Sequence, residues 1–180
     1  MSPMVRRSLT IEHTLLGFLQ QGPLHGYQLH HQLNDPDGLG RVWRLKQARL
    51  YALLDRLEEE GYITSSLQQQ ETRPARRVFQ MTAHGQDAFQ AWLSTPVHTP
   101  REMRQEFQAK LYFSRLAGRE AAAQLITAQT QACQQWLTVH KSAASEENNG
   151  KSYVWLVDQY RIGQIHAMLD WLDICQEGLS

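Results

Sequence analysis

The sequence has few of the features that mark secreted, membrane-spanning or metal-binding proteins. It contains two cysteines, Cys133 and Cys175, and neither has a second thiol or a histidine at zinc-ligand spacing. We therefore expect no metal site, and we interpret both thiols as buried apolar groups in a reducing compartment, with a disulfide between them as the alternative. No apolar run approaches the roughly 18 residues of a membrane-spanning helix, and the N-terminus has no signal-peptide pattern. These absences predict a cytoplasmic protein.

An excess of charge of either sign is also missing. Lys+Arg and Asp+Glu each number 18; residues 1–95 hold 10 basic and 9 acidic side chains, and residues 96–180 hold 8 and 9. Any affinity for a nucleic acid must therefore come from local clusters. The sequence has no glycine-rich phosphate loop, nucleophile elbow or zinc motif. We expect neither an enzyme nor a bound cofactor.

Hydrophobic periodicity predicts three helices before residue 62. Apolar positions share one helical face in Leu9–Leu19, and a second, short helix covers Tyr27–Leu33. The third helix, Lys46–Gly61, has the clearest pattern, with leucines at i, i+3, i+4 and i+7 and a glycine at the position of a C-terminal cap. The expected core side of this helix consists of Leu50, Leu53, Leu54 and Leu57.

From residue 62 the apolar residues recur with a period of two, which predicts the strands of a β-hairpin. Strand-like runs occupy Tyr62–Thr64 and Arg77–Thr82, and the polar segment 68–76 between them is expected to be a loop. A further helix follows and ends near Leu93, and the linker 94–100 contains two prolines, which cannot lie inside a helix. Three helices, a wing and a further helix are the element order of a winged helix-turn-helix.

The remainder of the chain is expected to be helical, over about 101–116, 119–144 and 152–176. The last helix is apolar on more than one face, and two preceding helices are not expected to cover it fully. We therefore predict that a second copy of the chain covers it. The expected dimerisation residues are Trp155, Leu156, Tyr160, Ile165, Met168, Leu169, Trp171 and Leu172. The predicted fold is mainly α, with a winged helix-turn-helix DNA-binding domain over 1–95 and a helical dimerisation and effector domain over 101–180.

Two basic clusters lie in the elements that would read DNA. Four cations fall within residues 41–49, before and at the start of the third helix, and three glutamates lie at its other end. In a helix-turn-helix this end enters the major groove, where Arg and Lys suit guanine or phosphate and Gln suits adenine. Three wing arginines, with only Glu71 as a local acidic neighbour, suit the minor groove or its phosphates. The expected DNA-binding residues are Arg44, Lys46, Gln47, Ala48, Arg49, Tyr51, Arg73, Arg76 and Arg77.

Four segments resemble the PadR family of transcriptional regulators. Gly22–Leu29, which begins Gly-Pro-Leu-His-Gly-Tyr, is similar to the signature at the second helix, and Leu50–Ile63 to the recognition helix and its exit. Arg73–Gly85 is similar to the wing, and Arg104–Phe113 resembles the start of the long C-terminal domain of the larger members. The resemblance spans nearly the whole chain.

The resemblance implies a repressor that binds an inverted-repeat operator as a homodimer and is released by a small aromatic effector. Trp92 and Trp136 are candidate stacking groups for that effector, although aromatic residues at helical spacing more often belong to a core. Many members have Ser-Pro where this chain has Leu45-Lys46, and glycine where it has Thr72, so the operator preference cannot be transferred. A winged helix that binds another protein is the alternative, and the arginines of the wing favour DNA.

Overall fold

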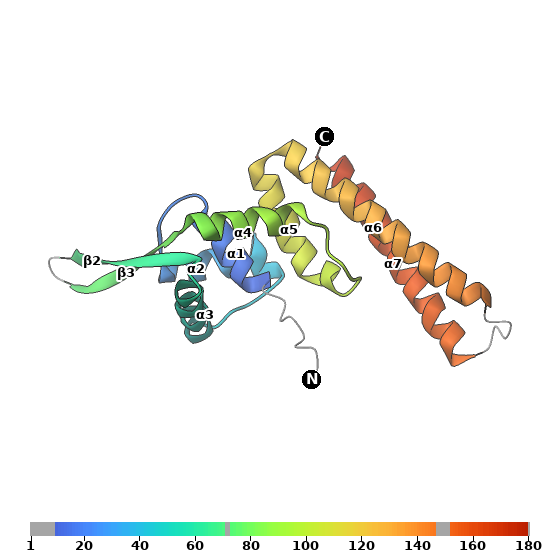
Figure 1. Ribbon diagram of the computed structural model, residues 1–180, viewed down its shortest axis with the longest axis horizontal. Helices are drawn as coiled ribbons and strands as arrows, with labels where there is room; N and C mark the ends of the chain where they lie inside the picture. Colours follow the sequence, from blue (N-terminus) through green and yellow to red (C-terminus); the bar gives the residue numbers. More distant parts are fainter. Residues whose placement is uncertain (1–9, 71–72, 147–151, 180) are drawn as a thin grey trace. The chain divides into compact units, whose positions relative to one another are not determined.

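The computed structural model describes residues 10–70, 73–146 and 152–179 (Figure 1). The chain divides into two compact units, with the division between Trp92 and Leu93. The first unit contains a winged helix-turn-helix and the second contains only helices. The predicted fold class, mainly α with a wing and additional C-terminal helices, is therefore confirmed.

Side-chain hydrogen bonds join two of the helices of the first unit. The helices of this unit are α1 (Thr10–Leu19), α2 (Gly26–Leu33), the 3-10 turn η1 (Leu39–Arg41), α3 (Gln47–Glu59) and α4 (Ala83–Ser94). The side chain of Asn34, just after α2, accepts from the backbone N–H of Leu45 at 2.9 Å and donates to the carbonyl of His30 at 2.8 Å. The His30 ring lies 2.9 Å from the Leu45 carbonyl. These bonds fix the chain just before α3 against the end of α2.

The wing is part of a three-stranded antiparallel sheet in the order β1-β3-β2. The strands are β1 (Leu24–His25), β2 (Ile63–Gln70) and β3 (Arg73–Met81), and the β2–β3 hairpin projects from the helices of its unit (Figure 1). Strand β1 was not predicted, because two residues are too few to show an alternating pattern.

The prediction of a loop over 68–76 was wrong. The strands continue to Gln70 and restart at Arg73, with a register shift between Gln68 and Gln70. A strand pair that projects from the core forms the same backbone hydrogen bonds whether or not its side chains are apolar, so a polar composition does not exclude it. The wing is therefore longer than the sequence indicated.

The core of the first unit joins all four helices to the sheet. Leu50 and Leu54 of α3 are fully buried, as expected, and Leu53 is only half-buried. Gly85 approaches the sheet closely, because a Cβ at this position would lie 2.1 Å from the carbonyl oxygen of Tyr62. The fully buried large side chains of this unit are Leu15, Leu16, Leu29, Leu33, Leu50, Leu54, Leu57, Ile63, Phe79 and Phe89. Each stabilises the unit by about 1.5–3 kcal/mol relative to exposure.

The second unit is built on a long helical hairpin. It contains η2 (Glu102–Arg104), α5 (Glu106–Ala117), α6 (Arg119–Glu146) and α7 (Tyr153–Glu177), and α6 and α7 lie side by side (Figure 1). Gly118, with φ of 127°, separates α5 from α6, and the Ser152 hydroxyl caps α7 by accepting from the Trp155 N–H at 3.1 Å. The buried core is formed by Val97, Met103, Phe107, Leu125, Ile126, Cys133, Ile165 and Leu172.

Buried polar side chains hold the segment that begins this unit. The Lys110 ammonium, 2% exposed, donates to the Thr95 carbonyl at 2.6 Å, and Gln129 accepts from the Val97 N–H at 2.8 Å. Desolvation lowers the pKa of Lys110, and the Glu106 carboxylate 3.5 Å away opposes that effect. The proline-containing linker therefore starts the second unit at a fixed position.

Candidate functional site

The N-terminal end of α3 presents a group of exposed polar and basic side chains. Lys46 precedes the helix, and Gln47, Ala48 and Arg49 form its exposed first turn, whereas Leu50 is fully buried. Arg44 is also exposed. In the described part of the chain, the cations of this group (Arg44, Lys46 and Arg49) have no carboxylate within ion-pair distance. This end of α3 is therefore a compact surface of uncompensated positive charge.

Tyr51 differs from the other residues expected on this surface. It is half-buried, and its ring covers Gly26 at the start of α2, where an added Cβ would lie 2.6 Å from the Tyr51 hydroxyl oxygen. Glycine is therefore needed at position 26 for α2 to approach α3 this closely. Tyr51 holds the first turn of α3 against α2.

Glu71 was expected to be the only local acidic neighbour of the wing arginines, but Arg77 has acidic partners on another element. Its guanidinium donates to Asp55 at 2.7 Å and to Glu58 at 2.5 Å, both on α3, and to the Ser65 hydroxyl at 3.3 Å. The hydrogen bond from Ser65, followed by the charge of Arg77, lowers the pKa of Glu58. Hydrogen bonding to Asp55 and the two carboxylate charges raise the pKa of Arg77. Arg77 thus ties the wing to α3.

Arg76, the neighbour of Arg77, contacts a different part of the unit. Successive residues of a strand point to opposite faces of the sheet, and the Arg76 guanidinium lies over the Tyr27 ring, 5.5 Å from its centroid. Tyr27 lies in the first turn of α2 and is half exposed. Arg73 pairs with Gln70 in the ladder, and its side chain lies outside the described residues, as does Thr72.

The residues expected to form a dimer divide into two sets on α7. Ile165 and Leu172 are fully buried in the core of their own unit, so they stabilise that unit. The half-buried residues Trp155, Met168, Leu169 and Trp171 lie between the buried and exposed sides of α7. Leu156 and Tyr160 are 54% and 66% exposed. They share a stripe of three- and four-residue spacing whose members are Tyr153, Leu156, Tyr160, Gly163, Ala167, Asp170 and Ile174, all of them exposed.

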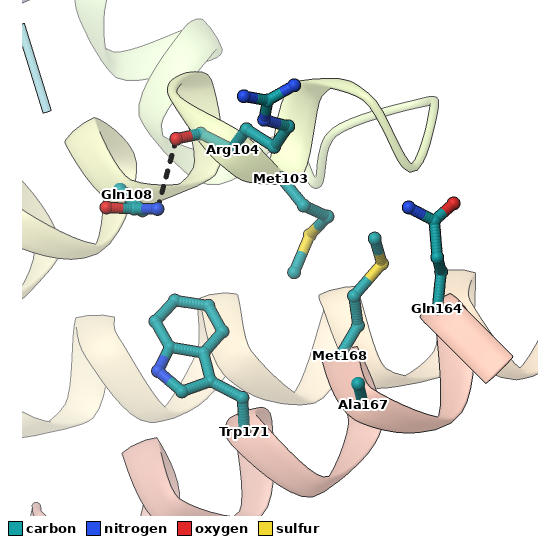
Figure 2. Close-up of a pocket in the computed structure, with 7 residues that line it drawn as sticks. All are labelled: Met103, Arg104, Gln108, Gln164, Ala167, Met168 and Trp171. Carbon is teal, nitrogen blue, oxygen red and sulfur yellow. Dashed lines mark hydrogen bonds between the residues drawn. The ribbon is translucent and has the colours of Figure 1, made fainter.

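Neither Trp92 nor Trp136, the two tryptophans considered for an effector, lines either of the two cavities described below. Trp92 stacks on His13 with ring centroids 5.2 Å apart in the first unit, and Trp136 packs against the core of the second. A cavity of about 330 Å³ lies instead between η2, α5 and α7. Figure 2 shows the side chains of Met103, Met168 and Trp171 pointing into the same space.

A second hollow of about 540 Å³ adjoins this cavity and shares with it Arg104, Gln164 and Met168. Arg101, Arg161 and His140 contribute further basic groups to its lining. His140 also contacts the buried carboxylate of Asp158 on α7 at 3.1 Å. An apolar space therefore continues into a space lined by arginines.

The sequence predicted no membrane-spanning helix and no metal site, and it left a disulfide open. Over the described part of the chain, no helix is long and apolar enough to cross a membrane, and no cluster of three or more His, Cys, Asp or Glu side chains could hold a metal ion. Cys133 and Cys175 are both free, which excludes the disulfide that the sequence left open. Burial raises the pKa of both thiols.

The chain is similar in sequence to known proteins. Residues 15–91 match the transcriptional regulator PadR-like family. The negative transcriptional regulator PadR of Bacillus subtilis (strain 168) is 29% identical over 121 residues, which are 67% of this chain and 65% of that protein. The aligned region thus spans slightly less than two thirds of the relative.

Two solved structures show the extent of the likeness. Bacillus subtilis PadR in complex with operator DNA has 23% identity and a TM-score of 0.47, covering 94% of this chain and 99% of that one. The PadR-like regulator BC1756 from Bacillus cereus has 20% identity and a TM-score of 0.45, covering 98% and 99%.

The first unit, with its wing and exposed α3 terminus, has the features of a winged helix-turn-helix of the transcription-factor class. Over residues 15–91, the chain is similar to the PadR-like family of transcriptional regulators. This agrees with the expectation of a regulator rather than an enzyme.

Proposed function

We propose that the protein is a sequence-specific, double-stranded-DNA-binding repressor that acts as a homodimer in the cytoplasm and is released by a small aromatic effector. The observation that carries the proposal is the exposed start of α3, where Arg44, Lys46 and Arg49 have no carboxylate partner among the described residues. Uncompensated cations beside a side chain that can pair with adenine, Gln47, combine phosphate attraction with base recognition.

The wing supports the same proposal. Arg77 is bound to Asp55 and Glu58 of α3, so the orientation of the hairpin is coupled to that of the recognition helix. With α3 in the major groove, the hairpin would reach the adjacent minor groove, where the narrow width favours arginine. Residues 1–95 are thus proposed as the DNA-binding domain. Arg73 and Arg76 would contact DNA alongside the start of α3. Arg77 and Tyr51 would contribute by positioning the wing and the first turn of α3.

The stripe on α7 supports the homodimer. A monomeric protein rarely exposes a row of large apolar side chains such as Leu156, Tyr160 and Ile174 on one helix. The three- and four-residue spacing is that of a seam between paired helices, and Gly163 and Ala167 in the middle would allow two backbones to approach. We propose residues 101–180 as the dimerisation and effector domain, which would hold two winged units over an inverted repeat.

Release by an effector is supported by the cavity beside α7. Met103, Met168 and Trp171 offer a deformable apolar wall for an aromatic ring (Figure 2), and the adjoining arginines suit an anionic substituent. A panel of aromatic carboxylates and their uncharged analogues tests this. We expect Arg104→Gln to impair release by the anionic compounds and leave DNA affinity in their absence unchanged.

Repression is the expected direction of regulation because the Bacillus subtilis relative is named a negative transcriptional regulator. A winged helix that binds only another protein is the competing possibility. The uncompensated cations at α3 favour DNA, because a protein partner would need matching acidic groups at both α3 and the wing.

Selection of DNA from a random duplex pool by the purified protein tests the proposal directly. We expect an enriched inverted repeat whose half-sites are about one helical turn apart, or a multiple of it. A matched selection with Gln47→Ala and Arg49→Ala shows whether α3 reads the enriched bases. Failure of the wild-type protein to enrich any duplex would refute DNA recognition, and enrichment of a single half-site would refute the dimer.

A further inference from the structure

An exposed stack of three side chains lies where α2 meets the wing. The ring of Tyr27 stacks on that of His25, with centroids 5.6 Å apart and an angle of 15° between the planes. The Arg76 guanidinium lies over the Tyr27 ring, 5.5 Å from its centroid. Tyr27 is 50% exposed, and His25 and Arg76 are half-buried. We call this group the His25–Tyr27–Arg76 stack.

The stack is attached to both elements that would read DNA. Gly26, between two of its members, lies directly under the Tyr51 ring from the first turn of α3. His25 pairs with Val78 of β3, and its Nδ1 lies 3.3 Å from the Arg77 carbonyl oxygen. The stack therefore occupies the surface between the start of α3 and the base of the wing.

That position defines the part of a duplex that the stack would face. If α3 enters the major groove and the wing enters the adjacent minor groove, the surface between them faces the sugar-phosphate backbone that separates the two grooves. A ligand at this surface would therefore present phosphate oxygens rather than base edges. Arg76 has donors for such oxygens, because no carboxylate among the described residues pairs with it.

We propose that the His25–Tyr27–Arg76 stack binds a backbone phosphate of double-stranded DNA, with Arg76 as the contacting residue and Tyr27 as a positioning residue. The proposal rests on the DNA-binding function proposed above. The aromatic face orients the guanidinium and leaves the N–H groups at its edge available for two parallel hydrogen bonds to phosphate. Ordering a long arginine side chain before DNA arrives reduces the entropy lost on binding.

The two adjacent wing arginines, Arg76 and Arg77, provide an internal comparison. Both guanidinium groups lie over aromatic rings, since that of Arg77 is 4.8 Å from the Phe79 centroid. The Arg77 donors, however, are directed to the carboxylates of Asp55 and Glu58. Arg76 is held by an uncharged aromatic face, which leaves its charge uncompensated. The same wing therefore contains one arginine whose charge is compensated by protein carboxylates and one that has no carboxylate partner among the described residues.

The experiment combines Tyr27→Leu and Tyr27→Phe with Arg76→Gln in the full-length protein. Fluorescence anisotropy gives the affinity for the selected operator duplex as a function of salt. We expect Tyr27→Leu to weaken binding about two- to fivefold per half-site, from the loss of one exposed cation–π contact. Tyr27→Phe retains the aromatic face and is expected to bind like the wild type. In the Arg76→Gln background, Tyr27→Leu should cause no further loss.

Arg76→Gln by itself should lower the slope of log affinity against log salt by about 0.9 per half-site. An unchanged slope would overturn the proposal, as would equal losses for Tyr27→Phe and Tyr27→Leu, or additive losses in the double variant. These results differ from failure of the proposed function, in which the wild-type protein itself binds no duplex. Thermal melting of each variant separates lost binding from lost folding, and the phenylalanine variant preserves the packing of the ring.

Discussion

Replacing Arg77 by glutamine is expected to weaken the winged unit without removing a charge that DNA would neutralise. The substitution removes ion pairs to Asp55 and Glu58, whose side chains are 53% and 33% exposed. Ion pairs of such exposure contribute about 0.2–1 kcal/mol each because solvent screens them. Loss of both pairs and of the hydrogen bond to Ser65 therefore lowers the free energy of unfolding by about 1–2 kcal/mol. For a unit of this size, the melting temperature should fall by roughly 5–15 °C.

The pH dependence follows from the lowered pKa of Glu58. A carboxyl group whose pKa is lower in the folded than in the unfolded state stabilises the fold above its unfolded pKa, about 4.3, and this stabilisation is lost as the pH falls through the folded pKa. Arg77, whose pKa is raised, stays charged throughout. The difference in stability between wild type and Arg77→Gln should therefore be full at neutral pH and shrink below about pH 4.

Calorimetric melting at several pH values, together with anisotropy titrations over a range of salt concentrations, measures both consequences. We expect Arg77→Gln to lower the melting temperature and leave the salt slope of DNA binding unchanged, because its charge is already compensated by Asp55 and Glu58. Arg76→Gln is the matched control, which should lower the salt slope and leave the melting temperature unchanged. A reduced salt slope with unchanged stability in Arg77→Gln would show that Arg77 contacts phosphate and that the ion pairs contribute nothing.

Truncation after Thr95 should give a monomer with much weaker operator binding, because the two half-sites are then bound independently; a dimer in sedimentation would place the interface elsewhere. Gln47→Ala should change base preference more than overall affinity, whereas a uniform loss across operator variants would assign Gln47 to phosphate contacts. Gly85→Ala should destabilise the winged unit by about 1–3 kcal/mol, because its Cβ would lie 2.1 Å from the Tyr62 carbonyl oxygen. An unchanged melting temperature would show that the backbone adjusts freely there.

The local periodicity of apolar residues was sufficient to predict much of the fold. The spacing of the leucines in α3 identifies the buried side of the helix, because residues three or four apart lie on the same helical face. Strand β1 and the outer part of the wing could not be predicted in this way. Leu24–His25 becomes a strand only because it pairs with Val78 and Phe79, more than 50 residues later in the chain. Tertiary pairing, rather than local propensity, determines such segments.

In the candidate site, too, the local pattern predicted some features, and others depend on contacts between distant elements. The exposed start of α3 follows from the leucines that fix the opposite side, so sequence reasoning placed Lys46 and Arg49 on one surface. The role of Arg77 was missed because its carboxylate partners belong to another element. A signal was nevertheless present. Asp55 and Glu58 share one face of α3. Because adjacent strand residues point to opposite sides of a sheet, either Arg76 or Arg77 would face that helix.

A net charge of zero is compatible with binding a polyanion because the charges are sorted along α3. Glu58 and Lys46 are 12 positions apart, which is roughly 18 Å along a helix axis at 1.5 Å per residue. This is about twice the Debye length of about 8 Å at physiological ionic strength. Two of the three glutamates at the far end are moreover engaged by protein cations, Glu58 by Arg77 and Glu60 by Arg56. A phosphate at the start of α3 would therefore experience the local cations and little of the acidic end. Affinity should accordingly depend on the charges at the start of α3 rather than on the net charge of the chain.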